Sequence, residues 1–248
     1  MHWTEDFFDE YYLKSIDRIT GKEQTDSEVN FLIEHSEIDR DGLILDLACG
    51  HGRHAIELAG RGFTHVTGMD LAIQFLNMAK ENAAALSNPP QFIHKNMNDF
   101  EETDKYDLIY SLFSSLFYFD DKRNLEILKR VHAGLNRDGY LIIDYFNPIE
   151  FLKRNRKRNW FFTSDEYLIL DEISHNPISG IITNERQIIT PEGKRIKRMF
   201  HVRDYTVAEL RYHLENIGFE IINVFGNFDS SPFTIRSPRQ IFVMKKTI

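Results

Sequence analysis

The sequence has a single cysteine and no long apolar segment. Cys49 is the only cysteine among 248 residues, which excludes an internal disulfide and the disulfide-built folds of small secreted proteins. No uninterrupted apolar run approaches the roughly 18 residues that a membrane-spanning helix needs. Residues 1–10 are acidic and aromatic, whereas a secretory leader begins basic and then turns apolar. These absences predict a cytoplasmic protein.

The histidines also lack the spacing of a metal site. His51 and His54 stand three residues apart, and the other histidines are scattered along the chain. A structural zinc site needs several Cys or His ligands at close, regular spacing. The sequence therefore predicts no bound metal.

Basic residues are scarce in the first part of the chain. The net charge is −8, but residues 1–150 carry 14 basic and 27 acidic side chains, and residues 151–248 carry 16 and 11. Basic runs at 153–158 and 194–198 allow an RNA-associated, non-catalytic module as one alternative. Neither run belongs to a recognisable RNA-binding module, so a solvated insertion is the favoured interpretation and a nucleic-acid partner is disfavoured.

The most informative stretch spans residues 43–54. A short apolar run from Leu43 to Leu45 predicts a buried strand, Gly50 and Gly52 predict a tight turn, and helical spacing begins at Arg53. Glycines let a ligand approach the backbone closely, and a helix N-terminus suits an anionic group. An ordinary strand-to-helix turn would give the same pattern.

A second feature favours a nucleotide-like ligand. Residues 64–69 predict another strand, which ends at Asp70, 20 residues beyond Gly50. From that position a carboxylate accepts hydrogen bonds from both hydroxyls of a ribose. A nicotinamide-dependent oxidoreductase uses the same combination and is the second enzyme alternative. It expects a third small residue, for which Ala55 would serve, but four residues (46–49) separate the strand from the glycines.

Strands and helices alternate along most of the chain. Further strands are predicted at 91–94, 106–110 and 140–145, with helices at 71–86 and 125–135 between them. Thr206 caps a helix that Gly218 ends, and residues 219–225 and 240–245 predict a final hairpin. The fold class is therefore α/β, with a doubly wound, mainly parallel sheet of seven strands.

Two segments lie outside this alternation. Residues 149–204 alternate polar and apolar residues with turns between them, which predicts an inserted antiparallel sheet of three or four strands. Residues 3–13 and 27–35 predict amphipathic helices, the second capped within Thr25–Ser27. We expect a helical lid at 1–40, a core at 41–148 and 205–248, and a substrate cap at 149–204.

Four motifs give the chain a resemblance to a known family. Residues 46–54, 66–71, 96–100 and 106–110, in this order and spacing, resemble the class I S-adenosylmethionine-dependent methyltransferases. The resemblance covers about 41–147, resumes near Tyr205, and is similar to the small-molecule type, including amino-sugar and glycine N-methyltransferases. It implies a Rossmann-like core, S-adenosylmethionine as the cofactor, and methyl transfer to N or O of a small polar molecule.

The resemblance also implies which residues contact the cofactor. Backbone groups of the glycine turn, a ribose-binding carboxylate and an aromatic lid residue are expected to take part. A carboxylate contact is expected from the arginine that follows the turn, and an asparagine replaces the family's usual acidic residue at the adenine. The residues are Tyr11 (or Tyr12), Asp46, Ala48, Gly50, Gly52, Arg53, Asp70, Leu71, Asn96, Met97 and Ser111.

The acceptor side is less defined by sequence. The loop that begins at Ser111 resembles that of amino-sugar N-methyltransferases, where a histidine stands at the place of Tyr118. Tyr118 is therefore the candidate catalytic residue and would orient an acceptor amine, although a phenol with a pKa near 10 is a poor base. The fourth motif lacks the Asn-Pro-Pro-Tyr sequence of enzymes that methylate nucleic-acid amines. The sequence leaves the oligomeric state open between monomer and homodimer.

Overall fold

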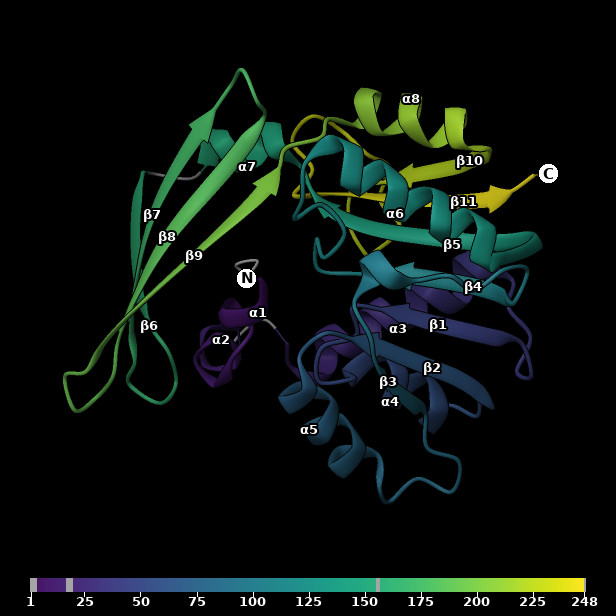
Figure 1. The fold of residues 1–248 in the computed structure, drawn as a ribbon, viewed down its shortest axis with the longest axis horizontal. Helices are drawn as coiled ribbons and strands as arrows, with labels where there is room; N and C mark the ends of the chain where they lie inside the picture. The colour runs from purple at the N-terminus through teal and green to yellow at the C-terminus, as the bar shows by residue number, and fades with distance from the viewer. Residues whose placement is uncertain (1–3, 17–19, 155–156, 248) are drawn as a thin grey trace.

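The computed structural model describes residues 4–16, 20–154 and 157–247. These residues form two sheets that lie beside each other in Figure 1. The larger sheet has seven strands in the order β10-β11-β5-β4-β1-β2-β3, and the smaller has four in the order β6-β7-β8-β9. The strands are β1 (Leu43–Leu47), β2 (His65–Asp70), β3 (Gln91–His94), β4 (Tyr106–Ser111), β5 (Leu135–Phe146), β6 (Arg158–Phe162), β7 (Leu168–Asn176), β8 (Ile181–Ile189), β9 (Arg195–Arg203), β10 (Phe219–Phe225) and β11 (Arg239–Lys246).

The larger sheet is parallel except at one strand. β11 pairs antiparallel with both β5 and β10, while the pairs among β1 to β5 are parallel. The predicted fold class, including the final hairpin and the inserted antiparallel sheet, is confirmed. The helices are α1 (Thr4–Phe7), α2 (Glu10–Ile16), α3 (Lys22–Ser36), α4 (Arg53–Gly60), α5 (Ile73–Ala83), the 3-10 turn η2 (Met97–Asp99), α6 (Asp121–Gly134), α7 (Pro148–Arg154) and α8 (Val207–Ile217).

Helices cover both faces of the seven-stranded sheet (Figure 1). β1 shows why its sequence begins with consecutive apolar residues: Leu45 and Leu47 pack in one hydrophobic cluster, and Ile44 packs in the other. The first cluster includes side chains of α6 and α8, and the second includes side chains of α3, α4 and α5. A strand buried on both faces needs apolar residues at consecutive positions, and Ile44 and Leu45 meet this need.

Helix boundaries at the N-terminus differ from the expectation. α3 begins at Lys22, five residues before the predicted start, with Gly21 as its N-cap. Thr25 does not cap it, because its hydroxyl donates to the Gly21 carbonyl at 3.2 Å from inside the first turn. The predicted helix at 3–13 is two short helices, and its first residue lies outside the described residues. The predicted cap at Thr206 is confirmed, with Glu209 completing a capping box.

The N-terminal helices lie between the inserted sheet and the core (Figure 1). They are tied to the sheet by Arg198, which donates to Asp9 at 2.6 Å, by Arg186, which donates to Ser15 at 2.7 Å, and by a Lys14–Asp165 ion pair. Two of these contacts are ion pairs, and they run in opposite senses: a basic residue of the sheet binds Asp9, and an acidic residue of the insertion binds Lys14.

The basic run at 153–158 also has partners within the chain. Arg154 pairs with Glu150, and Arg158 pairs with Glu172 at 3.1 Å; residues 155 and 156 lie outside the described residues. Both pairs are local, so they give these two arginines partners within the chain but leave the side chains largely exposed.

Candidate active site

One cleft brings together the loops at the carboxyl ends of the first four strands and the N-terminal helices. It encloses about 970 Å³ of space between protein atoms, its mouth included. Ligand sites of doubly wound sheets lie at this edge. Of the residues predicted from sequence, ten line the cleft: Tyr12, Asp46, Ala48, Gly50, Arg53, Asp70, Leu71, Asn96, Met97 and Tyr118.

The glycine turn after β1 presents backbone to the cleft. Ala48 and Gly50 both have left-handed backbones, with φ of 64° and 56°. A Cβ built on Gly50 would meet no atom within 4 Å, so the space beside it is open to a ligand. The backbone N–H groups of Ala48 and Cys49 both donate to the Met69 carbonyl, at 2.8 and 3.1 Å, which fixes the turn against the end of β2.

Asp70 links this turn to the start of α5. One carboxylate oxygen accepts from the Gly50 N–H at 2.8 Å, and the other accepts from the Ala72 N–H at 2.8 Å. Burial raises the pKa of Asp70 above its ordinary value, although these backbone donors oppose the shift. The carboxylate is held rigidly at the mouth of the β1–β2 crevice, where a ribose would lie.

Gly52 has a different role from Gly50. It is not among the cleft-lining residues, and a Cβ there would lie 2.8 Å from Ala79 and from the ring of Phe92. Its φ of 77° begins α4, and its missing side chain lets α4 pack against α5 and β3. The sequence pattern predicted both glycines but did not separate ligand approach from helix packing.

Asp46 is a buried carboxyl with an unsatisfied oxygen at the base of the cleft. It is 2% exposed, and its Oδ2 has no hydrogen-bond partner among the described residues. Burial raises the pKa of Asp46 to about 7, with the nearby hydroxyl of Tyr110 and the charge of Arg53 acting in the opposite direction. The cationic amino group of S-adenosylmethionine is the kind of donor that this oxygen lacks, so the residues present fit the cofactor.

We expect Asp46→Asn to stabilise the ligand-free protein at neutral and alkaline pH. The pKa of Asp46 in the folded state lies above the value near 3.9 in the unfolded state, so the unfolded state loses the proton first as pH rises. The contribution of Asp46 to the free energy of unfolding therefore falls between pH 4 and pH 7. Denaturant unfolding of both proteins at pH 4, 6 and 8 measures this. The free energy of unfolding of the variant, relative to that of the wild type, should increase as pH rises, and the variant should bind S-adenosylmethionine more weakly. A difference in unfolding free energy that does not change with pH would contradict the assignment.

Arg53 belongs to a buried ion cluster that the sequence did not predict. Its guanidinium pairs with Glu28 of α3 and donates to Thr25 at 2.9 Å, and His54 contacts the same Glu28 carboxylate at 2.8 Å. Burial acts to raise the pKa of Glu28, but the hydrogen bonds and charges of His54 and Arg53 outweigh it and lower the pKa to about 2. Arg53 is thereby held at the cleft, next to the ring of Phe113.

The loop after β4 is held in a strained conformation. Phe113 and Ser114 are consecutive residues with positive φ, 66° and 62°. The Phe113 N–H donates to the Asp144 carboxylate at 2.8 Å, the Ser114 N–H donates to the Asp144 carbonyl at 3.1 Å, and Arg239 pairs with the same carboxylate. Strained backbone held by buried partners is a common property of functional loops. Neither Asp144 nor Arg239 had a signal in the sequence.

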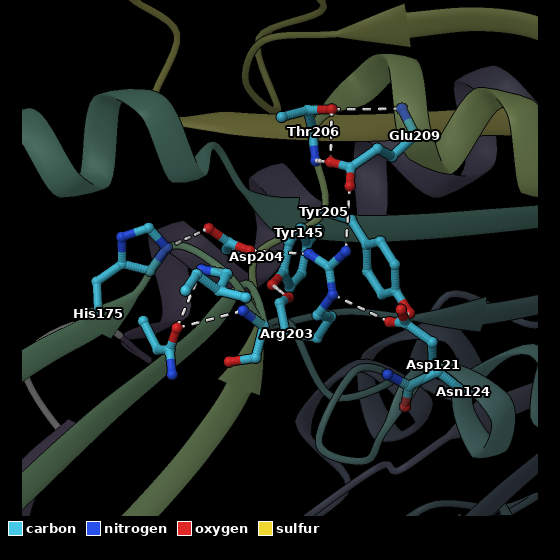
Figure 2. Close-up of polar contacts among 12 residues, drawn as sticks. Asp121, Asn124, Tyr145, His175, Arg203, Asp204, Tyr205, Thr206 and Glu209 are labelled. Atoms are coloured by element: carbon cyan, nitrogen blue, oxygen red, sulfur yellow. Dashed lines mark hydrogen bonds and ion pairs between the residues drawn. The ribbon is translucent and has the colours of Figure 1, made fainter.

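Arg203 fixes the other end of that loop (Figure 2). Its guanidinium contacts three carboxylates, Asp121 at 3.0 Å, Asp204 at 2.8 Å and Glu209 at 3.1 Å. Its backbone N–H donates to the Phe117 carbonyl at 3.0 Å. The last residue of the inserted sheet therefore joins α6, α8 and the cleft-lining loop.

The structure separates the two tyrosines that the sequence offered as the aromatic lid residue. Tyr12 lines the cleft, whereas Tyr11 packs beside Tyr167 at the inserted sheet. Ser111 is also outside the cleft lining and 1% exposed, and Ser115 of the same loop takes the lining position. Neighbouring residues on a helix point about 100° apart. The sequence of a short helix with few apolar positions does not show which of two adjacent tyrosines faces the cleft.

Asn96 and Met97 line the cleft on the far side of Asp70. The Asn96 side-chain oxygen accepts from the Asn98 N–H at 2.9 Å and caps the η2 turn. The Asn96 side chain therefore caps a turn and also lines the cleft.

Opposite the glycine turn, the cleft has an aromatic wall made of Phe8, Tyr12, Phe75 and Tyr118. The ring centroid of Phe8 lies 4.9 Å from that of Tyr12 and 5.7 Å from that of Tyr118. The ring centroids of Tyr12 and Phe75 are 6.3 Å apart. Burial raises the pKa of Tyr12 to about 12 and that of Tyr118 further still. Both raised pKa values favour the neutral phenol, which makes Tyr118 a poor base.

His51 is a cleft residue that stays uncharged. Burial lowers its pKa to about 4, helped by the neighbouring charge of Arg53. No group of three or more His, Cys, Asp or Glu side chains among residues 4–16, 20–154 and 157–247 is arranged to hold a metal ion.

The sheet order and the cleft define the fold of a class I methyltransferase. Comparisons with known proteins agree: the family model described as Methyltransferase domain matches residues 44–139. YqeM from Bacillus subtilis is 26% identical over 227 residues, which cover 86% of this chain and 87% of YqeM. Glycine/sarcosine N-methyltransferase from Aphanothece halophytica is 24% identical over 237 residues, covering 93% and 86%.

Solved structures show the same architecture. The structure of an S-adenosylmethionine-dependent methyltransferase from Clostridium acetobutylicum has a TM-score of 0.81 with 20% identity, covering 96% of this chain and 97% of that one. This chain is a class I S-adenosylmethionine-dependent methyltransferase, and S-adenosylmethionine is its methyl donor. In the part of the chain that the structure describes, no helix has the length and apolarity needed to cross a membrane.

Proposed function

We propose that the enzyme transfers the methyl group to a nitrogen of a small organic molecule, and that the acceptor binds against the aromatic wall. The observation that carries this proposal is the position of Phe8, Tyr12 and Tyr118 in the same cleft as the Gly50 turn and Asp70. Among the relatives, the Aphanothece enzyme is named for amine methylation, which agrees with a nitrogen acceptor.

The chemistry asks the protein for alignment more than for bond activation. When bound, S-adenosylmethionine supplies a methyl group already activated by its sulfonium. A nitrogen that accepted this methyl group would gain positive charge, and the π-faces of Phe8, Tyr12 and Tyr118 would stabilise a cation within about 6 Å. A hydroxyl acceptor must lose its proton as it is methylated and ends as a neutral ether, so a wall that stabilises a cation would favour it less than an amine.

The N-terminal helices and the inserted sheet would exclude water from this reaction. Phe8 and Tyr12 come from the N-terminal segment, and that segment is fastened to the inserted sheet through the Arg198–Asp9 and Arg186–Ser15 contacts. We propose that residues 1–40 act as a lid, 149–204 as a substrate cap, and 41–148 with 205–248 as the cofactor-binding core.

The test is product formation from S-adenosylmethionine with two matched panels of acceptors. One panel contains small primary and secondary amines, and the other contains the corresponding alcohols and phenols, with mass spectrometry of the methylated product. We expect turnover confined to the amine panel. Methylation of hydroxyls at equal rates would contradict the nitrogen assignment but leave the donor assignment intact.

Tyr118→Phe should reduce catalysis only modestly. The ring that contributes to the aromatic wall remains, and the lost hydroxyl is a neutral group whose hydrogen bond contributes about 1 kcal/mol. We expect the acceptor KM to rise up to roughly tenfold, with kcat changed less and the same pH profile. Tyr118→Ala, which removes the ring, should lose far more; equal losses in both variants, or a lost limb of the pH profile in Tyr118→Phe, would show that the hydroxyl takes a proton.

A further inference from the structure

The inserted sheet has one covered face and one exposed face. Ile169, Ile188 and Ile196 are buried on the covered face, where Tyr11 packs against them. Because side chains alternate along a strand, their neighbours in sequence point to the opposite side. Figure 1 shows the N-terminal helices between this sheet and the core, so the covered face is the one turned toward the cleft.

The exposed face carries large apolar side chains in register. Trp160 pairs with Leu170 across β6 and β7, and Leu168 pairs with Ile189 across β7 and β8. Trp160 is 68% exposed and Met199, on β9, is 46% exposed. The solvent face of an antiparallel sheet is usually polar, so an apolar patch made of Trp160, Leu168, Leu170, Ile189 and Met199 marks a surface that another molecule covers.

Charges of both signs border this apolar patch. Lys197 pairs with Gln187 in the row of Trp160, and Arg195 lies at the end of the neighbouring row. Glu172 and Glu185 pair with each other in the next row, where Arg158 also binds Glu172 at 3.1 Å. Because charges of both signs alternate on this face, a second copy of it matches the pattern better than a uniformly anionic nucleic acid or membrane does. A second copy of the same face, turned by a two-fold axis, can set Arg195 and Lys197 against these carboxylates and also place a cation on the indole of Trp160.

We infer that the enzyme is a homodimer in which the exposed faces of two inserted sheets pack against each other. The contact joins β6–β9 of one copy to β6–β9 of the other, with Trp160 and Leu170 at its centre. Each sheet also holds a lid segment on its covered face, through Arg186 and Arg198. Dimerisation would therefore brace the lids of both clefts from outside.

The mass of the full-length protein in solution tests this inference. Sedimentation velocity from 1 to 100 µM should give a dimer for the wild type. Trp160→Glu and Met199→Glu, at two exposed positions on the same face, should each weaken the dimer at least 100-fold. The matched control Tyr212→Glu changes a residue 66% exposed on α8 and should leave the dimer intact.

The outcomes separate the inference from the enzymatic proposal. Binding of S-adenosylmethionine by each variant checks that it is folded, and the mass is read independently of turnover. A wild type that stays monomeric at 100 µM overturns the inference. So does a dimer that survives both face variants, or one that the Tyr212→Glu control also dissociates.

Discussion

Asp70→Ala should bind S-adenosylmethionine at least about 100-fold more weakly than the wild type. The carboxylate holds the Gly50 and Ala72 N–H groups, each at 2.8 Å, and lies where the ribose hydroxyls would donate. Hydrogen bonds to a charged group contribute about 1.5–3 kcal/mol each, so the loss of two accounts for this factor. Calorimetric titration of the variant measures it directly.

Asp99→Ala is the matched control for this variant. Asp99 is an exposed carboxylate of the neighbouring η2 turn and is not among the cleft-lining residues, so its removal should leave the affinity within about twofold. Thermal unfolding of both variants shows whether the turn remains folded. If Asp70→Ala were folded and bound the cofactor normally, the ribose assignment would be wrong.

Gly50→Ala and Gly52→Ala should fail in different ways. At Gly50 the added methyl group meets no protein atom within 4 Å, so the cost to folding is the left-handed backbone alone, about 1–2 kcal/mol. The same methyl group occupies the space beside the turn where the cofactor would pass. We expect a variant that remains folded, with a small drop in Tm, and loses cofactor binding.

At Gly52 the added methyl group collides with the protein instead. It would lie 2.8 Å from both Ala79 and Phe92, and such overpacking costs a further 1–3 kcal/mol or so. The free energy of unfolding should fall by about 2–5 kcal/mol in total, the larger loss of the pair. Urea unfolding and calorimetry on both variants decide the matter: equal stability losses, or retained binding in Gly50→Ala, would contradict the separate roles.

The sequence was sufficient for the features that depend on local patterns. The apolar β1 run, the two glycines and Asp70 depend on spacing within one βαβ unit, and the structure places Gly50 and Asp70 in direct contact at 2.8 Å. The alternation of strands with helices also predicted the sheet class, because parallel strands need crossover helices. The insertion was visible because its period of two departs from that alternation.

The features that the sequence did not reveal depend on contacts between distant segments. Glu28 reaches Arg53 and His54 from α3, and Arg239 reaches Asp144 across 95 positions of sequence. No local pattern marks such partners. The choice of Tyr12 over Tyr11 depends likewise on how a short helix docks on the inserted sheet, which its own sequence does not specify.

The charge asymmetry shows the same limit. Counted along the sequence, the basic C-terminal part favoured a solvated insertion and allowed an anionic partner as the alternative. In the structure, Arg198 of the insertion pairs with Asp9 of the N-terminal segment at 2.6 Å. Part of the complementarity that the composition revealed is therefore internal.

The most direct test of the account is a calorimetric titration of the wild-type protein with S-adenosylmethionine and, in parallel, with NAD. The geometry of Gly50, Asp46 and Asp70 predicts a single site per chain for S-adenosylmethionine, with a micromolar Kd, and no heat from NAD at the same concentrations. Binding of NAD without binding of S-adenosylmethionine would contradict the assignment of the cleft, and with it the nitrogen-methylation proposal that depends on it.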